Sequence, residues 1–149
     1  FKDDGFCHRI SASRPWKAFV SADNPLSQKE YLTLQDFSDQ TLMHFVGERY
    51  TSSWRMLSGF FAKHGIPIKE RLVRCSSLYD YLCISLQDAI LLFPPSRESL
   101  LNHDDNNNRI MLDIHCEEPF ELNLYAVYCK NRDTRLIERY LEIVEREMS

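Results

Sequence analysis

Residues 16–27 read WKAFVSADNPLS, residues 33–37 read TLQDF, residues 41–68 read TLMHFVGERYTSSWRMLSGFFAKHGIPI and residues 76–96 read SSLYDYLCISLQDAILLFPPS. Short apolar runs of strand length alternate here with amphipathic segments of helix length. Hydroxyl side chains stand at the junctions between them. This alternation is typical of βα units that build a parallel or mixed sheet. The stretch therefore predicts an α/β domain.

Working outward from this stretch, the apolar periodicity and the turn residues predict the remaining elements. Strands are expected over residues 6–13, 16–22, 42–46, 70–75, 89–93, 110–116 and 122–128. A helical turn capped by Thr33 is expected over residues 33–37. Longer helices are expected from Thr51, Ser52 or Ser53 to His64, from Ser76 or Ser77 to Leu86, over residues 96–101, and from Asp133 or Thr134 to Met148. Gly65 supplies the stop signal of the first of these helices.

Composition narrows the class of protein. The chain has 149 residues, a formal net charge of −4 and 44% hydrophobic residues, as expected for one globular domain that is not itself a nucleic-acid binder. No apolar run approaches the roughly 18 residues that span a bilayer. The start FKDDGF does not resemble a signal peptide, and the missing initiator Met predicts a piece of a longer protein. The five cysteines are odd in number and never in C-x-x-C spacing, which favours a reducing cytoplasm.

The sequence does not favour a catalytic or metal-binding site. Asp104, Asn106 and Asn108 alternate as in a calcium loop, but the loop lacks a central glycine and has His115 where a bidentate glutamate is needed. The sequence contains no nucleophile elbow, phosphate-binding loop, dinucleotide fingerprint or zinc-protease motif. We therefore expect no catalytic residues, no metal and no cofactor.

Two hydroxyl clusters are the strongest candidates for a binding site. Thr51-Ser52-Ser53 and Ser76-Ser77 each follow a predicted strand and open a predicted helix. Ligands of open α/β sheets bind outside the carboxyl ends of the strands, where helix N-termini offer free N–H groups. Arg49 could hold a carboxylate in bidentate fashion. N-capping alone needs only one hydroxyl per helix, so capping remains the alternative. The predicted ligand-binding residues are Arg49, Thr51, Ser52, Ser53, Ser76, Ser77 and Pro94.

The chain resembles the effector-binding domain of LysR-type transcriptional regulators. Residues 18–26 (AFVSADNPL) are similar to a strand followed by the family's H-P-L signature, with Asn24 in place of the histidine. Residues 32–37 resemble its "sl-x-dL" turn, and residues 60–66 (FFAKHGI) resemble its helix end before a proline. Residues 77–94 resemble "v-a-a-G-l-G-i-a-l-l-P", but Ser85 and Asp88 occupy the glycine positions, so the backbone and the cleft wall are expected to differ there. Residues 122–147 resemble the closing strand, turn and helix.

This resemblance implies a periplasmic-binding-protein-like (type 2) fold, with a mixed sheet flanked by helices. Residues 16–116 would form the second subdomain, and residues 117–149 the return strand and C-terminal helix. In the family the effector binds between two subdomains, and DNA is bound by a helix-turn-helix domain that is absent from this chain. We expect a small-molecule effector, with a carboxylate as candidate class, and a homodimer. The alternatives are a stand-alone solute-binding α/β domain and an enzyme-associated domain.

Overall fold

The computed structural model describes residues 6–46, 48–77, 80, 83–95, 108–129 and 134–148. Internal contacts divide the chain into two compact units. The larger unit is Trp16–Phe120, and the smaller unit combines the two ends of the chain, up to Pro15 and from Glu121 onward. The chain therefore enters the larger unit at Trp16 and leaves it at Phe120, and each unit is described by itself below.

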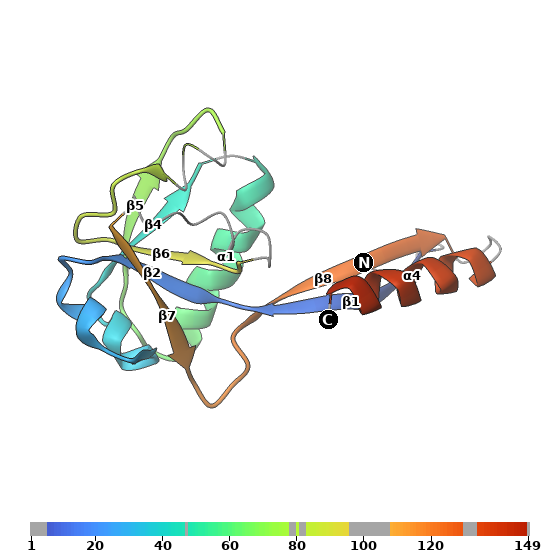
Figure 1. Ribbon diagram of the computed structural model, residues 1–149, viewed down its shortest axis with the longest axis horizontal. Helices are drawn as coiled ribbons and strands as arrows, with labels where there is room; N and C mark the ends of the chain where they lie inside the picture. Colours follow the sequence, from blue (N-terminus) through green and yellow to red (C-terminus); the bar gives the residue numbers. More distant parts are fainter. Residues whose placement is uncertain are drawn as a thin grey trace. The chain divides into compact units, whose positions relative to one another are not determined.

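The larger unit is built on a six-stranded sheet (Figure 1). The strand order is β3-β7-β2-β6-β4-β5. Strand β2 runs antiparallel to β6 and β7, whereas β4 runs parallel to β5 and β6, and β3 parallel to β7. This confirms the predicted mixed sheet. The strands are β2 (Lys17–Ser21), β3 (Tyr31–Thr33), β4 (Thr41–Phe45), β5 (Lys69–Val73), β6 (Ile90–Phe93) and β7 (Arg109–His115).

Helix α1 (Glu48–Lys63) covers one face of this sheet (Figure 1). Its apolar side chains recur three and four residues apart, as in a helix that buries one face. Phe61 is fully buried, and its ring lies 5.1 Å from that of Phe37. The helix ends before Gly65, whose φ of +68° is the left-handed conformation that glycine adopts at low cost. The predicted helix stop is confirmed.

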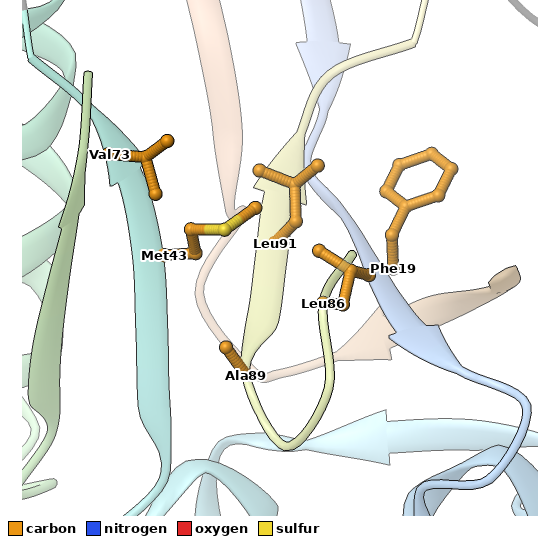
Figure 2. Packing of buried hydrophobic residues seen from close by; sticks show 6 residues of the cluster. All are labelled: Phe19, Met43, Val73, Leu86, Ala89 and Leu91. Carbon is orange, nitrogen blue, oxygen red and sulfur yellow. The ribbon is translucent and has the colours of Figure 1, made fainter. Parts of the chain in front are cut away.

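The opposite face of the sheet carries a second apolar cluster. Because side chains alternate along a strand, Met43 points away from α1. It packs with Leu91 on the neighbouring strand β6, and with Leu86 and Ala89 from the segment that precedes β6 (Figure 2). Phe19 and Val73 complete the buried part of the cluster. The central strands β2 and β6 are thus almost completely buried, as the apolar run of β6 requires.

Two short 3-10 helices connect the strands. Helix η1 (Pro25–Gln28) follows Asn24, whose side-chain oxygen accepts a hydrogen bond of 2.9 Å from the Leu26 N–H. Helix η2 (Leu34–Phe37) begins after Thr33, and Asp36 accepts a hydrogen bond of 2.8 Å from the Thr33 N–H. The helical turn capped by Thr33 is therefore confirmed, while η1 and β3 were not expected.

The smaller unit is a two-stranded antiparallel ribbon with one helix. Strand β1 (Phe6–Pro15) pairs with β8 (Glu121–Cys129), and α4 (Thr134–Met148) lies alongside them (Figure 1). Leu141 of α4 is almost completely buried. Both faces of β8 carry apolar side chains, which predicts burial on both faces, but this prediction is wrong because Tyr125 and Val127 are 52% and 46% exposed. Helix α4 covers only one face of the ribbon.

Three further expectations about helices need correction. Helix α1 begins at Glu48, so Thr51, Ser52 and Ser53 lie inside it and do not cap it. Residues 84–89 are not helical, because the chain turns through Gln87, with a φ of +53°, to enter β6. The apolar periodicity of α4 predicts a buried face that includes Leu136, Tyr140 and Leu141, but Leu136 is 75% and Tyr140 65% exposed.

Other expectations fall on residues that the structure does not describe. The helix over 96–101 and the loop at 103–107 lie outside the described residues. Across the described part of the chain, no helix combines the length and apolar character needed to cross a lipid bilayer.

Candidate functional site

Three parallel strands of the larger unit end at the same edge of the sheet. Phe45, the last residue of β4, is in register with Val73, the last residue of β5. Met43 is in register with Leu91, so β6 ends at this edge as well. The Val46 N–H donates a hydrogen bond of 2.9 Å to the Val73 carbonyl and extends the pairing beyond the strands. We call this the carboxyl edge.

All the predicted site residues follow strands that end at the carboxyl edge, because they come after β4, β5 or β6. Arg49 lies in the first turn of α1, and its side chain is not among those described. Thr51 and Ser52 are exposed and Ser53 is half-buried on the same helix. Because α1 begins three residues before Thr51, these hydroxyls are not needed as caps.

The second hydroxyl cluster follows β5. Ser76 and Ser77 are both exposed. The Ser77 hydroxyl accepts a hydrogen bond of 3.1 Å from the Asp80 N–H, which is the geometry of an N-cap. Within the described residues, Ser76 has no side-chain hydrogen bond. Pro94 is half-buried directly after β6. Thus Ser77 serves the backbone, whereas Ser76 is exposed and has no side-chain partner among the described residues.

A polar cluster behind the carboxyl edge was not predicted. His44 of β4 stacks on Trp54 of α1, and its Nε2 lies 2.8 Å from a carboxylate oxygen of Glu70 on β5. The Nδ1 atom of His44 is buried and has no hydrogen-bond partner within the described residues. A histidine near a strand end gives no sequence signal for such a contact, because its partners come from two other elements.

The opposite edge of the sheet holds a polar hollow of about 590 Å³. Arg71 donates a hydrogen bond of 2.7 Å to Asp88 in its wall, and this bond holds the pKa of the Asp88 carboxyl below its usual value. Ser85 and Asp88, the residues at the family's glycine positions, both line this hollow and not the carboxyl edge. Its lining residues are Ser21, Asp23, Asn24, Pro25, Cys83, Ile84, Ser85, Leu86, Gln87, Asp88, Asn108 and Arg109.

Metal-binding groups do not gather among the described residues. No set of three or more His, Cys, Asp or Glu side chains there could hold a metal ion. Of the calcium-like loop, Asn108 is described: its side-chain amide donates a hydrogen bond of 3.3 Å to Asp23. The Cys116 thiol donates to the Glu118 carbonyl, and burial raises the pKa of this thiol, with the Glu118 charge adding to the effect. A raised pKa makes Cys116 a poor nucleophile.

Comparisons with known proteins identify the fold. No protein-family model matches the sequence, and no curated protein sequence matches it. Among solved structures, the regulatory domain of CcmR from Synechocystis PCC6803 in complex with 2-PG matches with a TM-score of 0.70 and 15% identity, over 99% of this chain and 69% of that chain. The regulatory domain of MetR, a LysR family regulator from N. meningitidis, matches with a TM-score of 0.69 and 15% identity, over 98% of this chain and 68% of that one.

A third matching structure is a complex with shikimate. The effector-binding domain of QuiR in complex with shikimate matches with a TM-score of 0.69 and 15% identity, over 99% of this chain and 67% of that chain. The chain therefore has the α/β fold of LysR regulatory domains, and the predicted periplasmic-binding-protein-like (type 2) fold is confirmed.

Proposed function

We propose that this chain is the effector-sensing part of a LysR-type transcriptional regulator and binds a small molecule at its carboxyl edge. The observation that carries the proposal is the common edge at which β4, β5 and β6 end, because every residue singled out from the sequence follows one of these strands. The fold likeness to regulatory domains solved with 2-PG and with shikimate supports a sensing role. The same fold likeness favours ligand binding over catalysis as the function of this chain.

The proposed ligand is a small carboxylate. Arg49 is the only arginine in the predicted set and would pair with the carboxylate, because a planar guanidinium matches its two oxygens. Thr51, Ser52, Ser53 and Ser76 would donate hydrogen bonds to the rest of the ligand. Ser77 would support the site through the backbone, and Pro94 would contribute an apolar wall. Thr51 and Ser52 are exposed on α1, which supports this assignment.

The wider proposal concerns the complete regulator. We propose that the larger unit is the second subdomain and that the smaller unit contains the return strand and the C-terminal helix. DNA would be bound by a helix-turn-helix domain outside this chain, in a cytoplasmic homodimer. Effector binding would then alter DNA engagement by shifting the balance between two conformations.

A binding screen tests the site. Small carboxylates, shikimate among them, and aromatic acids are titrated into the isotope-labelled chain, and amide shifts are followed by NMR. We expect amide shifts at residues 49–53 and 74–77. In Arg49→Gln the affinity for the carboxylate should fall at least about ten-fold, because a charge-assisted pair of hydrogen bonds is lost. Ser76→Ala should weaken binding by less. Ser85→Ala at the opposite edge is the matched control. Shifts confined to the hollow around Ser85 would refute the site.

A further inference from the structure

The last two turns of α1 hold both segments that connect the two units. The Phe120 ring stacks on Phe60 of α1, with centroids 4.3 Å apart and planes at 23°. The backbone N–H of Trp16 donates a hydrogen bond of 3.1 Å to the Phe120 carbonyl. The ring centroids of Trp16 and Phe120 lie 6.2 Å apart. The segment that enters the larger unit and the segment that leaves it are thus joined to each other and to α1.

Charged groups strengthen this attachment. Lys63, the last residue of α1, donates hydrogen bonds of 2.8 and 2.7 Å to the two carboxylate oxygens of Glu118. The Nε2 atom of His64 lies 3.4 Å from the same carboxylate. Its Nδ1 lies 2.9 Å from the Phe60 carbonyl and must carry a proton, because a carbonyl oxygen only accepts. One carboxylate therefore fixes the outgoing segment to the helix end.

The other end of α1 lies at the carboxyl edge. The helix has 16 residues and begins at Glu48, three residues after the end of β4 at Phe45. At 1.5 Å per residue it is about 24 Å long. A packed helix moves as a rod, so a tilt imposed at one end displaces the other end. The proposed effector hydroxyls stand on the first turns of this rod, and the attachment to Glu118 and Phe120 stands on its last turns.

We propose that the contacts of Glu118 with Lys63 and His64 act as a latch, which here means an attachment that can open. Through this latch, α1 links the carboxyl edge to both connecting segments. A ligand that tilts α1 would have to carry Phe120 and Trp16 along or open the latch. Glu118 acts here as a positioning residue and touches no ligand. The proposed movement of α1 on effector binding rests on the proposed function. The attachment of Glu118 to the end of α1 rests only on its contacts with Lys63 and His64.

Amide hydrogen exchange tests the latch in the full chain without any effector. The Trp16 amide reports directly, because it donates to the Phe120 carbonyl. We expect exchange of this amide to become about two- to five-fold faster in Glu118→Gln, which is the range that an exposed ion pair allows. Glu117→Gln removes the same charge from the neighbouring residue and should leave exchange unchanged. Equal protection of Trp16 in both variants would overturn the latch.

Fluorescence tests the link along α1. The chain has two tryptophans, and one of them, Trp54, lies in the amino-terminal half of α1, nine residues before Lys63. In the Trp16→Phe variant Trp54 is the sole reporter. Adding Glu118→Gln should change the emission or the acrylamide quenching of Trp54, whereas adding Glu117→Gln should not. A Trp54 signal insensitive to Glu118→Gln would refute the link while leaving the effector site untouched.

Discussion

The imidazole of His44 lies parallel to the indole of Trp54, with ring centroids 4.1 Å apart and planes at 5° to each other. This contact joins β4 to the amino-terminal half of α1. It therefore sets how the helix that carries Thr51, Ser52 and Ser53 rests on the sheet. The Glu70 carboxylate, 2.8 Å from His44 Nε2, fixes the imidazole from the side of β5.

Removal of this stack should loosen α1. We expect Trp54→Ala to lower the free energy of unfolding by about 2–3 kcal/mol, because a large aromatic contact is lost and a cavity is left. Met56→Ala on the same helix is the control, since Met56 is 41% exposed and should cost under about 0.5 kcal/mol. Urea denaturation followed by circular dichroism measures both. Equal losses in the two variants would mean that the stack does not anchor the helix.

Acid should release the latch at Glu118. The hydrogen bonds from Lys63 are the main cause that holds the pKa of Glu118 below its ordinary value of 4.5. When the pKa of a carboxyl is lower in the folded state than in the unfolded state, the ionised carboxyl stabilises the fold. This stabilisation is complete above the unfolded-state pKa, and it is lost as the pH falls through the folded-state pKa. The latch is therefore formed at neutral pH and opens only below pH 4.5.

The side-chain carboxyl carbon of Glu118 reports this titration by NMR. The groups that face the carboxylate are Lys63, His64 and the Cys116 thiol. In Lys63→Met the midpoint should move up toward the ordinary value, because the strongest donor is gone. A midpoint that does not move in Lys63→Met would show that the ion pair is absent in solution.

The smaller unit should self-associate. Its ribbon has an exposed apolar face that includes Tyr125 and Val127, and no third strand pairs with it among the described residues. An exposed apolar ribbon is a template for pairing with another chain. We expect a two-fold dimer at tens of micromolar, and Val127→Asp should dissociate it. Light scattering on a size-exclusion column measures the mass.

The control is Val46→Asp, because Val46 is similarly exposed, at 37%, in the larger unit. It should leave the dimer intact. A wild-type mass of 17.6 kDa would contradict self-association, and a dimer unaffected by Val127→Asp would place the interface elsewhere.

The chain by itself should not bind duplex DNA at physiological salt. Its net charge is −4, and nucleic-acid affinity arises largely from neutralised phosphates and released counterions. Fluorescence anisotropy with a labelled duplex is expected to show no saturable binding. Specific binding by this chain would contradict the proposal that DNA contact belongs to another domain.

Much of the secondary structure follows from local sequence. The apolar runs at β4 and β6 are short and end at breaker residues, so their strands could be predicted within a residue or two. Thr33 with Asp36 caps η2, and Gly65 ends α1, because these residues satisfy the backbone locally. The helix predicted from Ser76 or Ser77 to Leu86 extends too far, because residues 84–86 are not helical. Leu86 is buried by tertiary packing with Met43 and Leu91, and not by helical periodicity.

The order of the strands and the contacts between distant residues were decided by tertiary structure alone. The sequence determined that hydroxyl clusters follow strands, but only the register of β4 with β5 and β6 brings those strand ends to one edge. Lys63 and Glu118 are 55 residues apart, and no periodicity relates them. Such pairs form because the sheet twists and α1 packs across it, and these long-range constraints leave no signature in a local stretch of sequence.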